Sequence, residues 1–494
     1  MFVRFCSAIT LSLLFPHSAL AAASCAEVLK ILGAQLADAT CFVSSDLTTN
    51  NAQTTPLNNS LPGLPPFAFT PQTDRGVISP NPPNRTPITK VVPGLQIQAR
   101  IASDPLGQAR FLLRLPADWN GRLVVAGASG TRSEFNGDFA WSDYVVQQGY
   151  AYASQNKGVY NFRLSSDPLS DPLACRFNPD LPLAAFPIHF YANDPGQIFT
   201  RWAEFMVKAG RIAQQGAKAA YGRSPRFTYA VGTSNGGYQV RRAIEAAPDV
   251  FDGGVDWEGT FVDDEAPNVL TDLPPAILNF PDYRASGFNS ASTAAANIRG
   301  AGYPPDIVAG TASFWANHWA SFWEVTQCQW QKRLDPSYDT YGSGTGTYNY
   351  VSRLSVSDVG EQLAAFANTG KVRQPLVTVA GTMDALLPID HHARAYARKV
   401  ASASKHSKHD DDDRADRPSP YRLYEIQNGN HLETYKDTFT QLEFIQPHAQ
   451  RALDLVVEHV ERHRSLPPSQ CVARGTSIAD APAQPGHCAS LFVP

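Results

Sequence analysis

The stretch from Phe227 to Ala243, FTYAVGTSNGGYQVRRA, constrains the fold of this chain more than any other segment. An apolar run ends in the pentapeptide GTSNG, Gly232 to Gly236, and passes at once into a sequence of helical character. A serine that attacks a carbonyl must stand clear of its own backbone, and a sharp strand-to-helix turn allows this only where the flanking positions are small. The pattern predicts a nucleophile elbow with Ser234 at a helix N-terminus. The alternative is a glycine-rich turn that contains a serine by chance.

Segments on either side of this turn alternate between strand-like and helix-like patterns. Short apolar or alternating runs predict strands at 95–101, 109–115, 123–126, 151–154, 227–231, 254–257, 375–380 and 421–426. Helical patterns lie at 139–148, 194–220, from the elbow to Pro248, at 390–402 and at 446–464. Strands that alternate with helices form a mostly parallel sheet with helices on both faces, and together with the elbow they predict an α/β-hydrolase fold.

Composition divides the 494 residues into unequal parts. We expect a catalytic domain at 94–258 and 374–494, preceded by an extended Pro-, Asn- and Thr-rich segment at 24–93 and interrupted by an inserted lid at 259–373. In the lid, Trp315, Trp319 and Trp323 recur every four residues, which places three indoles on one helix face. That face either packs on the body as core or lines a pocket for an apolar or aromatic substrate.

The first 23 residues have the pattern of a secretory signal peptide. Arg4 is followed by a largely apolar run from Ala8 to Phe15 and then by small residues up to Ala23. The run is too short to span a bilayer, so we expect a secreted or periplasmic protein without a membrane span. The formal net charge of −4 argues against a nucleic-acid partner.

Six cysteines remain once Cys6 is removed with the signal peptide, and an even set in an oxidising compartment predicts disulfides. Sequence-local pairing gives Cys25–Cys41 and Cys471–Cys488, which leaves Cys175–Cys328. Other connectivities stay open, as does lipid attachment at Cys25, which would leave one cysteine without a partner. No C-x-x-C motif or closely spaced Cys/His cluster is present, so no metal and no cofactor is expected.

A serine nucleophile needs a base and an acid, and in α/β-hydrolases they follow in the order Ser, Asp or Glu, His. Asp384 and His431 fit this order, since each lies just beyond the end of a predicted strand, on the same sheet edge as Ser234. Asp384 is alternatively a turn residue and His431 a surface loop residue. Asp256 and Glu258, which follow the strand after the elbow helix, are the fallback acids.

An oxyanion hole is expected from backbone N–H groups beside the nucleophile. One donor is Asn235, the residue after Ser234, and the other is Gly127 or Ala128 in the small-residue loop after the strand at 123–126.

The motifs WNGRLVVAGASG, GYAYASQNKG, GTSNGGYQVRRA, GTMDALLP and NGNH, in this order, resemble the tannase and feruloyl esterase family of secreted α/β-hydrolases. The similarity covers most of the chain from Cys25 to Cys488, and it implies a triad of Ser234, Asp384 and His431. Two departures distinguish the chain from the core tannase group. Thr233 and Leu432 stand where family members usually carry a bridging cysteine pair, and 259–373 has no acidic, glycine-bearing calcium loop.

These features predict a secreted serine esterase that acts through an acyl-enzyme on a small-molecule or oligomeric ester, with aromatic feruloyl- or galloyl-like esters as candidates. Three alternatives stay open. The chain is a hydrolase of hydroxyalkanoate oligomers or other polyester fragments, a serine peptidase with the same triad, or a catalytically silent binding protein that keeps the fold. The sequence does not indicate an oligomeric state.

Overall fold

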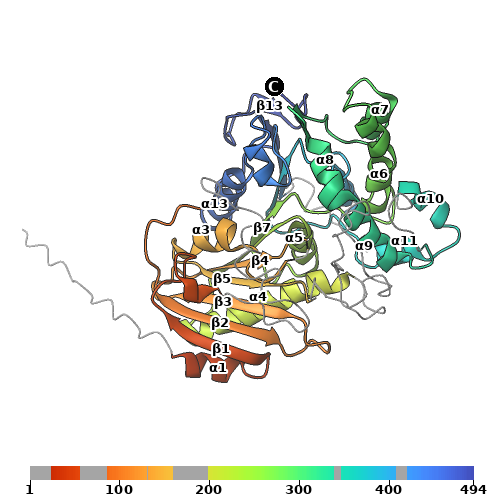
Figure 1. The fold of residues 1–494 in the computed structure, drawn as a ribbon. Helices are drawn as coiled ribbons and strands as arrows, with labels where there is room; N and C mark the ends of the chain where they lie inside the picture. The colour runs from red at the N-terminus through yellow and green to blue at the C-terminus, as the bar shows by residue number, and fades with distance from the viewer. Residues whose placement is uncertain (1–23, 56–85, 131, 159–198, 339–345, 408–419) are drawn as a thin grey trace, which may run out of the picture.

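The computed structural model describes residues 24–55, 86–130, 132–158, 199–338, 346–407 and 420–494 (Figure 1). The expected signal peptide at 1–23, Cys175 and the expected start of a helix at Asp194 lie outside these residues.

Most of the chain is organised around one sheet with the order β1-β2-β3-β5-β4-β6-β7-β10-β11-β12-β13. Its strands are β1 (Leu36–Ser44), β2 (Gly94–Ile101), β3 (Arg110–Pro116), β4 (Arg122–Gly127), β5 (Ala151–Gln155), β6 (Phe227–Thr233), β7 (Gly253–Trp257), β10 (Leu376–Gly381), β11 (Tyr421–Ile426), β12 (Gln470–Val472) and β13 (Gln484–Pro485). The pairs from β5 through β12 are parallel, whereas β1, β2 and β3 form an antiparallel edge that joins β5, and β13 is antiparallel to β12. The crossed order β3-β5-β4-β6 within this sheet is that of the α/β-hydrolase fold.

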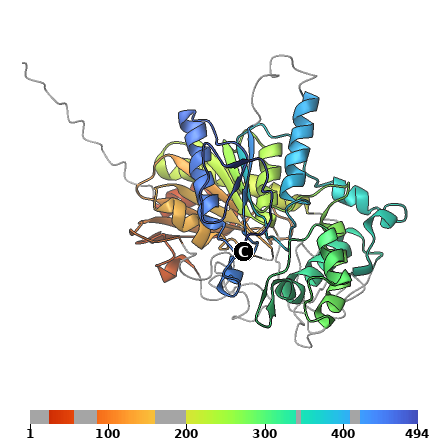
Figure 2. The ribbon, with the colours of Figure 1, turned by 90° about the horizontal axis from the view of Figure 1, so that it is seen from above.

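Helices cover both faces of the sheet, as Figures 1 and 2 show. Those of the body are α1 (Cys25–Leu32), α3 (Asp143–Val146), α4 (Thr200–Tyr221), α5 (Asn235–Ala246), α12 (Ala393–Ser407) and α13 (Gln446–Arg462), with short 3₁₀ or π turns η1 (Ala52–Thr54), η2 (Asp138–Ser142) and η6 (Glu433–Asp437). Successive strand side chains alternate between faces. In β4, Leu123 and Val125 join the core under α1, α4, α5 and α12, while Val124 and Ala126 join the core under α3 and α13. Burial on both faces explains why the central strands are largely apolar.

The insertion between β7 and β10 lies on one side of the body in both views, and its apolar side chains form one core with body residues such as Phe199, Tyr238 and Met383. Its elements are α6 (Val269–Ala285), α7 (Thr293–Gly300), β8 (Val308–Ala309), β9 (Ala312–Ser313), α8 (Phe314–His318), η3 (Trp319–Trp323), α9 (Glu324–Leu334), α10 (Tyr350–Arg353) and α11 (Val359–Ala364). Asp272 of α6 accepts a 2.8 Å hydrogen bond from Nδ1 of His391, in the loop before α12. This contact ties the insertion to the body.

The eight expected strands all occur, with ends that differ by at most two residues. Five further strands were not predicted: β1, within the segment at 24–93, β8 and β9 in the insertion, and β12 and β13 near the C-terminus. The segment at 24–93 is therefore not extended throughout, because α1 packs on the core and β1 pairs with β2. Strands β12 and β13, at one end of the sheet, span three and two residues, which is too short for a recognisable sequence pattern.

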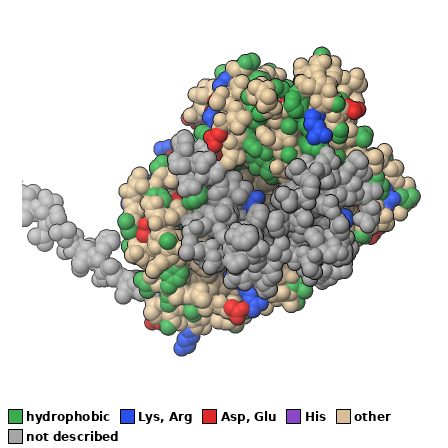
Figure 3. Space-filling model, viewed as in Figure 1, with side chains coloured by type: hydrophobic (Ala, Val, Ile, Leu, Met, Phe, Trp, Pro, Cys, Tyr) green, Lys and Arg blue, Asp and Glu red, His purple; other side chains and the backbone are tan. Residues whose placement is uncertain are grey.

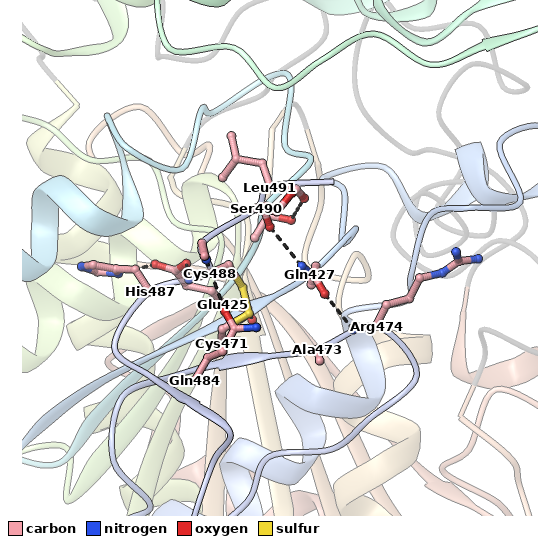
Figure 4. Close-up of a disulfide and its surroundings, with 12 residues drawn as sticks. Glu425, Gln427, Cys471, Ala473, Arg474, Gln484, His487, Cys488, Ser490 and Leu491 are labelled. Carbon is pink, nitrogen blue, oxygen red and sulfur yellow. Dashed lines mark hydrogen bonds and ion pairs between the residues drawn. A yellow bond between two sulfur atoms is a disulfide. The ribbon is translucent and has the colours of Figure 1, made fainter. Parts of the chain in front are cut away.

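Two disulfides join segments close in sequence, as predicted. Cys25–Cys41 links α1 to β1, and Cys471–Cys488 links β12 to the segment after β13 (Figure 4). The Cys25 sulfur is thus occupied, which contradicts lipid attachment there. Cys328 is also disulfide-bonded.

The C-terminal segment runs beside the loops that follow β10 and β11. The backbone N–H of Cys488 donates to Glu425 in β11 at 2.8 Å, and Gln427 donates to the carbonyl of Ser490 at 3.0 Å (Figure 4). Further along, the Thr382 hydroxyl donates to the carbonyl of Leu491, and the N–H of Val493 donates to Asn428 at 2.8 Å. The disulfide therefore holds residues 488–493, the C-terminal strap, against the loops that follow β10 and β11.

Charged side chains are scattered singly over the described part of the face in Figure 3, with hydrophobic side chains between them. Within the described residues, we find no helix of the length and apolarity that a membrane crossing requires.

Candidate active site

Ser234 occupies the turn between β6 and α5 with backbone angles φ 59° and ψ −123°, a conformation that L-residues rarely adopt. Its N–H donates to the carbonyl of Trp257 at 2.9 Å, which fastens the turn to β7. A Cβ atom at Gly232 would collide with the backbone of Gly236, and one at Gly236 would collide with Gly127. The glycines are therefore required by close backbone packing, and the turn has the geometry of a nucleophile elbow.

Asp384 and His431 lie in the loops after β10 and β11 and form a hydrogen-bonded pair. Nδ1 of His431 lies 2.8 Å from Oδ2 of Asp384. The other carboxylate oxygen, Oδ1, accepts the N–H groups of Leu386 and Leu387 at 2.8 and 2.7 Å. With the carboxylate fixed, Nδ1–H donates to it and Nε2 is left as the basic nitrogen.

Backbone contacts between neighbouring strands bring the loops to one sheet edge. Strands β6, β7, β10 and β11 are consecutive in the sheet, and Ser234, Glu258, Asp384 and His431 follow their ends in that order. The N–H of Met383 donates to the carbonyl of Gly429 at 2.8 Å, joining the two loops directly. Among the described residues no hydrogen bond joins the Ser234 hydroxyl to His431, as is common for catalytic groups without substrate.

Glu258 is a third titratable group at this edge. Its Oε2 lies 3.7 Å from Nδ1 of His431, and its Oε1 accepts the N–H of Gly381 at 2.9 Å. Burial raises the pKa of this carboxyl well above its ordinary value, and the charge of Asp384 raises the pKa further. One ligand atom each of Glu258, Asp384 and His431 lies within 4.8 Å of the others, a spacing that a metal ion can accept. The Asp384 oxygens are, however, committed to His431 and two backbone N–H groups, the arrangement of an acid–base pair.

Asp256, the other fallback acid, is committed elsewhere. Its carboxylate pairs with Nε of Arg241 at 2.5 Å and accepts bonds from Gly259 N–H and the Thr378 hydroxyl, each at 2.7 Å. These three partners occupy the carboxylate of Asp256, so Asp256 is not the acid that bonds the imidazole of His431.

The loop after β4 is held against the elbow by buried polar side chains. Gln239 of α5 donates to the carbonyls of Ala128 and Asn235, both at 2.9 Å. Lys157 donates to the carbonyl of Ser129 at 2.8 Å. As the first residue of α5, Asn235 has a backbone N–H without a partner in its helix, and the backbone of Gly127 and Ala128 lies against Gly236. The three expected oxyanion-hole residues are thus adjacent.

The three tryptophans at 315, 319 and 323 are buried to different degrees. Trp315 and Trp323 are fully buried in the core of the insertion, whereas Trp319 is half-buried between Phe280 and Arg284. A π turn, η3, interrupts the helix at this point, and the three indoles pack on α6, Trp319 and Trp323 against Phe280 and Trp315 against Tyr283. Only Trp323 contacts the loop of Asp384, through a 2.7 Å bond from Nε1 to the carbonyl of Ala385.

His318 is a residue whose position the sequence did not indicate. It is fully buried in α8, and burial lowers its pKa to about 4, with a small opposing influence of Asp384 and a further lowering by His431. Its Nδ1 donates to the carbonyl of Phe314 at 3.0 Å, and the neutral ring packs beside Trp323. The insertion thus brings a neutral imidazole close to the acid–base pair.

Part of the chain matches a known sequence family. Residues 345–491 match the family described as 3HB-oligomer hydrolase (3HBOH). A D-(-)-3-hydroxybutyrate oligomer hydrolase from Burkholderia thailandensis is 30% identical over 117 residues, and one from Burkholderia mallei is 29% identical over 116 residues. These matches span 22% of this chain and only 15% of the length of either relative.

Solved structures of similar arrangement include feruloyl esterase B from Aspergillus oryzae, at 13% identity and TM-score 0.45, over 87% of this chain and 88% of that one. Tannin acyl hydrolase from Aspergillus niger is similar at 12% identity and TM-score 0.46, over 91% of this chain and 90% of that one. Their names include the two kinds of enzyme that the sequence motifs resemble.

Proposed function

We propose that this protein is a serine carboxylic-ester hydrolase. The observation that carries the proposal is the Asp384–His431 pair, bonded at 2.8 Å, at the same edge of the sheet as a serine on a strained strand-to-helix turn. A catalytically silent fold has no physical reason to keep a serine at φ 59° beside a buried acid–base pair.

In the proposed reaction, the Ser234 hydroxyl attacks the ester carbonyl while Nε2 of His431 takes its proton. Asp384 stabilises the imidazolium that forms, and the N–H of Asn235 with that of Gly127 or Ala128 binds the developing oxyanion. The proton then passes to the departing alcohol as the C–O bond breaks, leaving an acyl ester on Ser234. Water, deprotonated by His431, hydrolyses that ester and returns the serine.

Oligomers of 3-hydroxyalkanoates are the substrate class we propose. The family match at 345–491 supports this choice, because the matched residues contain both Asp384 and His431. Aromatic esters are the second candidate, favoured by the resemblance of the motifs around Ser234 to tannases and feruloyl esterases. A peptidase with the same triad is a third reading, since the fold hosts both ester and amide chemistry.

One set of assays separates these candidates. The purified protein is given a 3-hydroxybutyrate trimer, methyl ferulate, p-nitrophenyl acetate and a peptide p-nitroanilide, with and without a serine-directed phosphonate. We expect the trimer to be cleaved fastest, all hydrolysis to stop with the phosphonate, and the label to be found on Ser234. Cleavage of the peptide alone would replace the esterase proposal, and no cleavage with no labelling would leave the silent binding protein.

We propose that the protein works outside the cytoplasm. Two observed disulfides and a fifth disulfide-bonded cysteine, Cys328, support folding in an oxidising compartment. Recovery of the protein from the periplasm or medium, beginning near Ser24, tests this proposal. A full-length chain in the cytoplasm with reduced cysteines would contradict it.

A further inference from the structure

Glu258 stands in the second layer of the candidate site with one carboxylate oxygen satisfied and one not. Its Oε1 accepts the N–H of Gly381, whereas Oε2 accepts no hydrogen bond of good geometry from the described part of the chain; the side chain of the preceding Trp257 acts on this carboxyl as a donor and opposes part of the rise in its pKa. The residue is 3% exposed and has φ 50°, in the left-handed region, and its own N–H is tied to the carbonyl of Val379 at 2.8 Å. A buried oxygen held without a donor is costly for an anion but acceptable for a protonated acid.

The neighbours of Glu258 favour the protonated form as well. Oxygens of Asp384 and Glu258 lie within 4.8 Å of each other and both approach Nδ1 of His431, at 2.8 and 3.7 Å. Two carboxylates in such a site do not both ionise readily. One negative charge beside Nδ1 is sufficient to stabilise the imidazolium of His431 that forms in the proposed reaction.

Other titratable groups around this carboxyl do not supply a compensating positive charge. Glu433 of η6 is a further acid whose charge raises the pKa of Glu258. From the insertion, His318 is neutral near pH 7 because burial lowers its pKa to about 4, and Tyr303 has a pKa raised well above its ordinary value by burial. Among the described groups named for this carboxyl, the cation that forms during the proposed reaction is the imidazolium of His431.

We propose that Glu258 is a positioning residue that keeps its proton while Asp384 is ionised, and that it becomes the charged partner of His431 Nδ1 when Asp384 is neutralised. The inference rests on the proposed function, since it assigns a task beside the base of that reaction. A protonated Glu258 limits the site to one negative charge. Its Oε2 lies 3.7 Å from Nδ1 of His431 and can become the acceptor of that nitrogen when Asp384 is neutral.

Three variants test the proposal: Glu258→Gln, Asp384→Asn, and the double variant that combines these two changes. They test whether Glu258 is protonated and whether it replaces Asp384 as the partner of His431. Glutamine keeps an oxygen for the Gly381 N–H and has the shape of the protonated acid, so the fold is retained. Asp384→Asn combined with Glu433→Gln is the matched control, because Glu433 is a buried acid nearby whose carboxylate accepts the N–H of Gln446 at 2.8 Å and does not bond His431. Melting temperatures of all variants are measured first.

The first readout needs no activity. The infrared difference spectrum of wild type minus Glu258→Gln at pH 7 should contain the carbonyl band of a protonated carboxylic acid. A carboxylate band in its place would overturn the proposal. This arm stands even if the wild-type protein hydrolyses no ester, a result that would overturn the proposed function instead.

The second readout is the pH profile of kcat/KM with p-nitrophenyl acetate. Replacing an already neutral group should leave the acidic limb of Glu258→Gln where it is in wild type, whereas loss of an ionised group would move that limb down by about one unit or more. Asp384→Asn should retain activity that rises with pH, and the double variant should lose about tenfold more. The assignment would be refuted if Asp384→Asn and Asp384→Asn/Glu258→Gln were equally active. It would also be refuted if the acidic limb of Glu258→Gln moved down by about one unit or more.

Discussion

The indole Nε1 of Trp323 donates a 2.7 Å hydrogen bond to the carbonyl of Ala385, the residue that follows Asp384. Trp323 belongs to the insertion and is fully buried, whereas Ala385 belongs to the loop that carries the proposed catalytic acid. The bond therefore connects the packing of the insertion to the position of the acid. It gives the insertion a structural role at the site that does not require contact with a substrate.

Trp323→Phe should lower kcat by more than a variant of equal stability that leaves the acid loop intact. The aromatic body is retained, but the Ala385 carbonyl loses its donor, at a cost of roughly 1–3 kcal/mol for a buried group, and the acid loop becomes less well held. Trp315→Phe is the control, because Trp315 is equally buried and its Nε1 donates to the carbonyl of Pro304 at 3.1 Å, within the insertion. Thermal unfolding and ester kinetics are compared for both. If Trp323→Phe and Trp315→Phe lose the same stability and have the same kcat, Trp323 serves only as a core residue.

The three indoles also allow a test of a substrate-contacting lid. Trp315→Ala and Trp323→Ala should each destabilise the protein by roughly 3–5 kcal/mol, because both side chains are fully buried. Trp319→Ala should cost less, since its side chain is half-buried. A rise in KM for bulky aromatic esters but not for acetyl esters in any of the three would instead support a substrate wall formed by the insertion.

Ser234→Ala should lower kcat by on the order of 10⁴-fold and leave the melting temperature nearly unchanged. Alanine accepts the same backbone contacts, so only the nucleophile is removed. His431→Ala should cost about as much, and the double variant little more than either, because groups that act as a unit are not additive. Rates with p-nitrophenyl acetate check this. A Ser234→Ala variant that folds and keeps most of its activity would refute the assignment of the nucleophile.

The Cys471–Cys488 disulfide should affect both stability and activity. Serine at both positions opens a loop of 17 residues, which costs about 3 kcal/mol in the chain-entropy description. The strap that it anchors bonds Thr382 and Asn428, just before Asp384 and His431, so kcat should fall as well. Removal of Cys25–Cys41, with a separation of 16 residues, is the matched control and should reduce stability without a comparable loss of kcat. Urea unfolding and kinetics of both variants decide whether the strap acts on the site.

Glu433 should make the protein less stable as the pH rises through neutrality. Burial raises the pKa of its carboxyl from 4.5 to about 7, despite hydrogen bonds from the N–H groups of Gln446 and Ile445. The folded state therefore binds a proton that the unfolded chain releases, so the contribution of Glu433 is complete below about pH 4.5 and is lost by about pH 7. Glu433→Gln cannot ionise, and it should flatten this fall by on the order of 3 kcal/mol.

Urea unfolding at pH 4.5 and pH 8 measures that difference for wild type and Glu433→Gln. Glu361→Gln, the same change at an exposed position of α11, is the control. An unchanged pH dependence in Glu433→Gln would show that the carboxyl ionises in the folded state as it does in the unfolded chain.

The sequence alone determined features that arise from neighbours along the chain. The glycines of GTSNG allow the close backbone approach that the turn at Ser234 requires, and the apolar run before them specifies a strand buried on both faces. Because successive parallel strands end at one edge, residues placed just after them, such as Asp384 and His431, were predicted to meet there, and they do. The two local disulfides were predictable for a similar reason, since their cysteines are 16 and 17 residues apart.

Tertiary structure alone decided which partner each side chain meets. Asp256 and Glu258 are two residues apart, and strand alternation assigns both to one face. The left-handed backbone at Glu258 turns its carboxyl to His431, while Asp256 pairs with Arg241 of α5. Burial likewise differs among the three indoles that pack on α6, since Trp315 and Trp323 are fully buried and Trp319 is half-buried. Periodicity predicts the direction in which a side chain leaves its own backbone. The partner that the side chain meets comes from a segment distant in sequence, and only the packing of the whole chain places that partner.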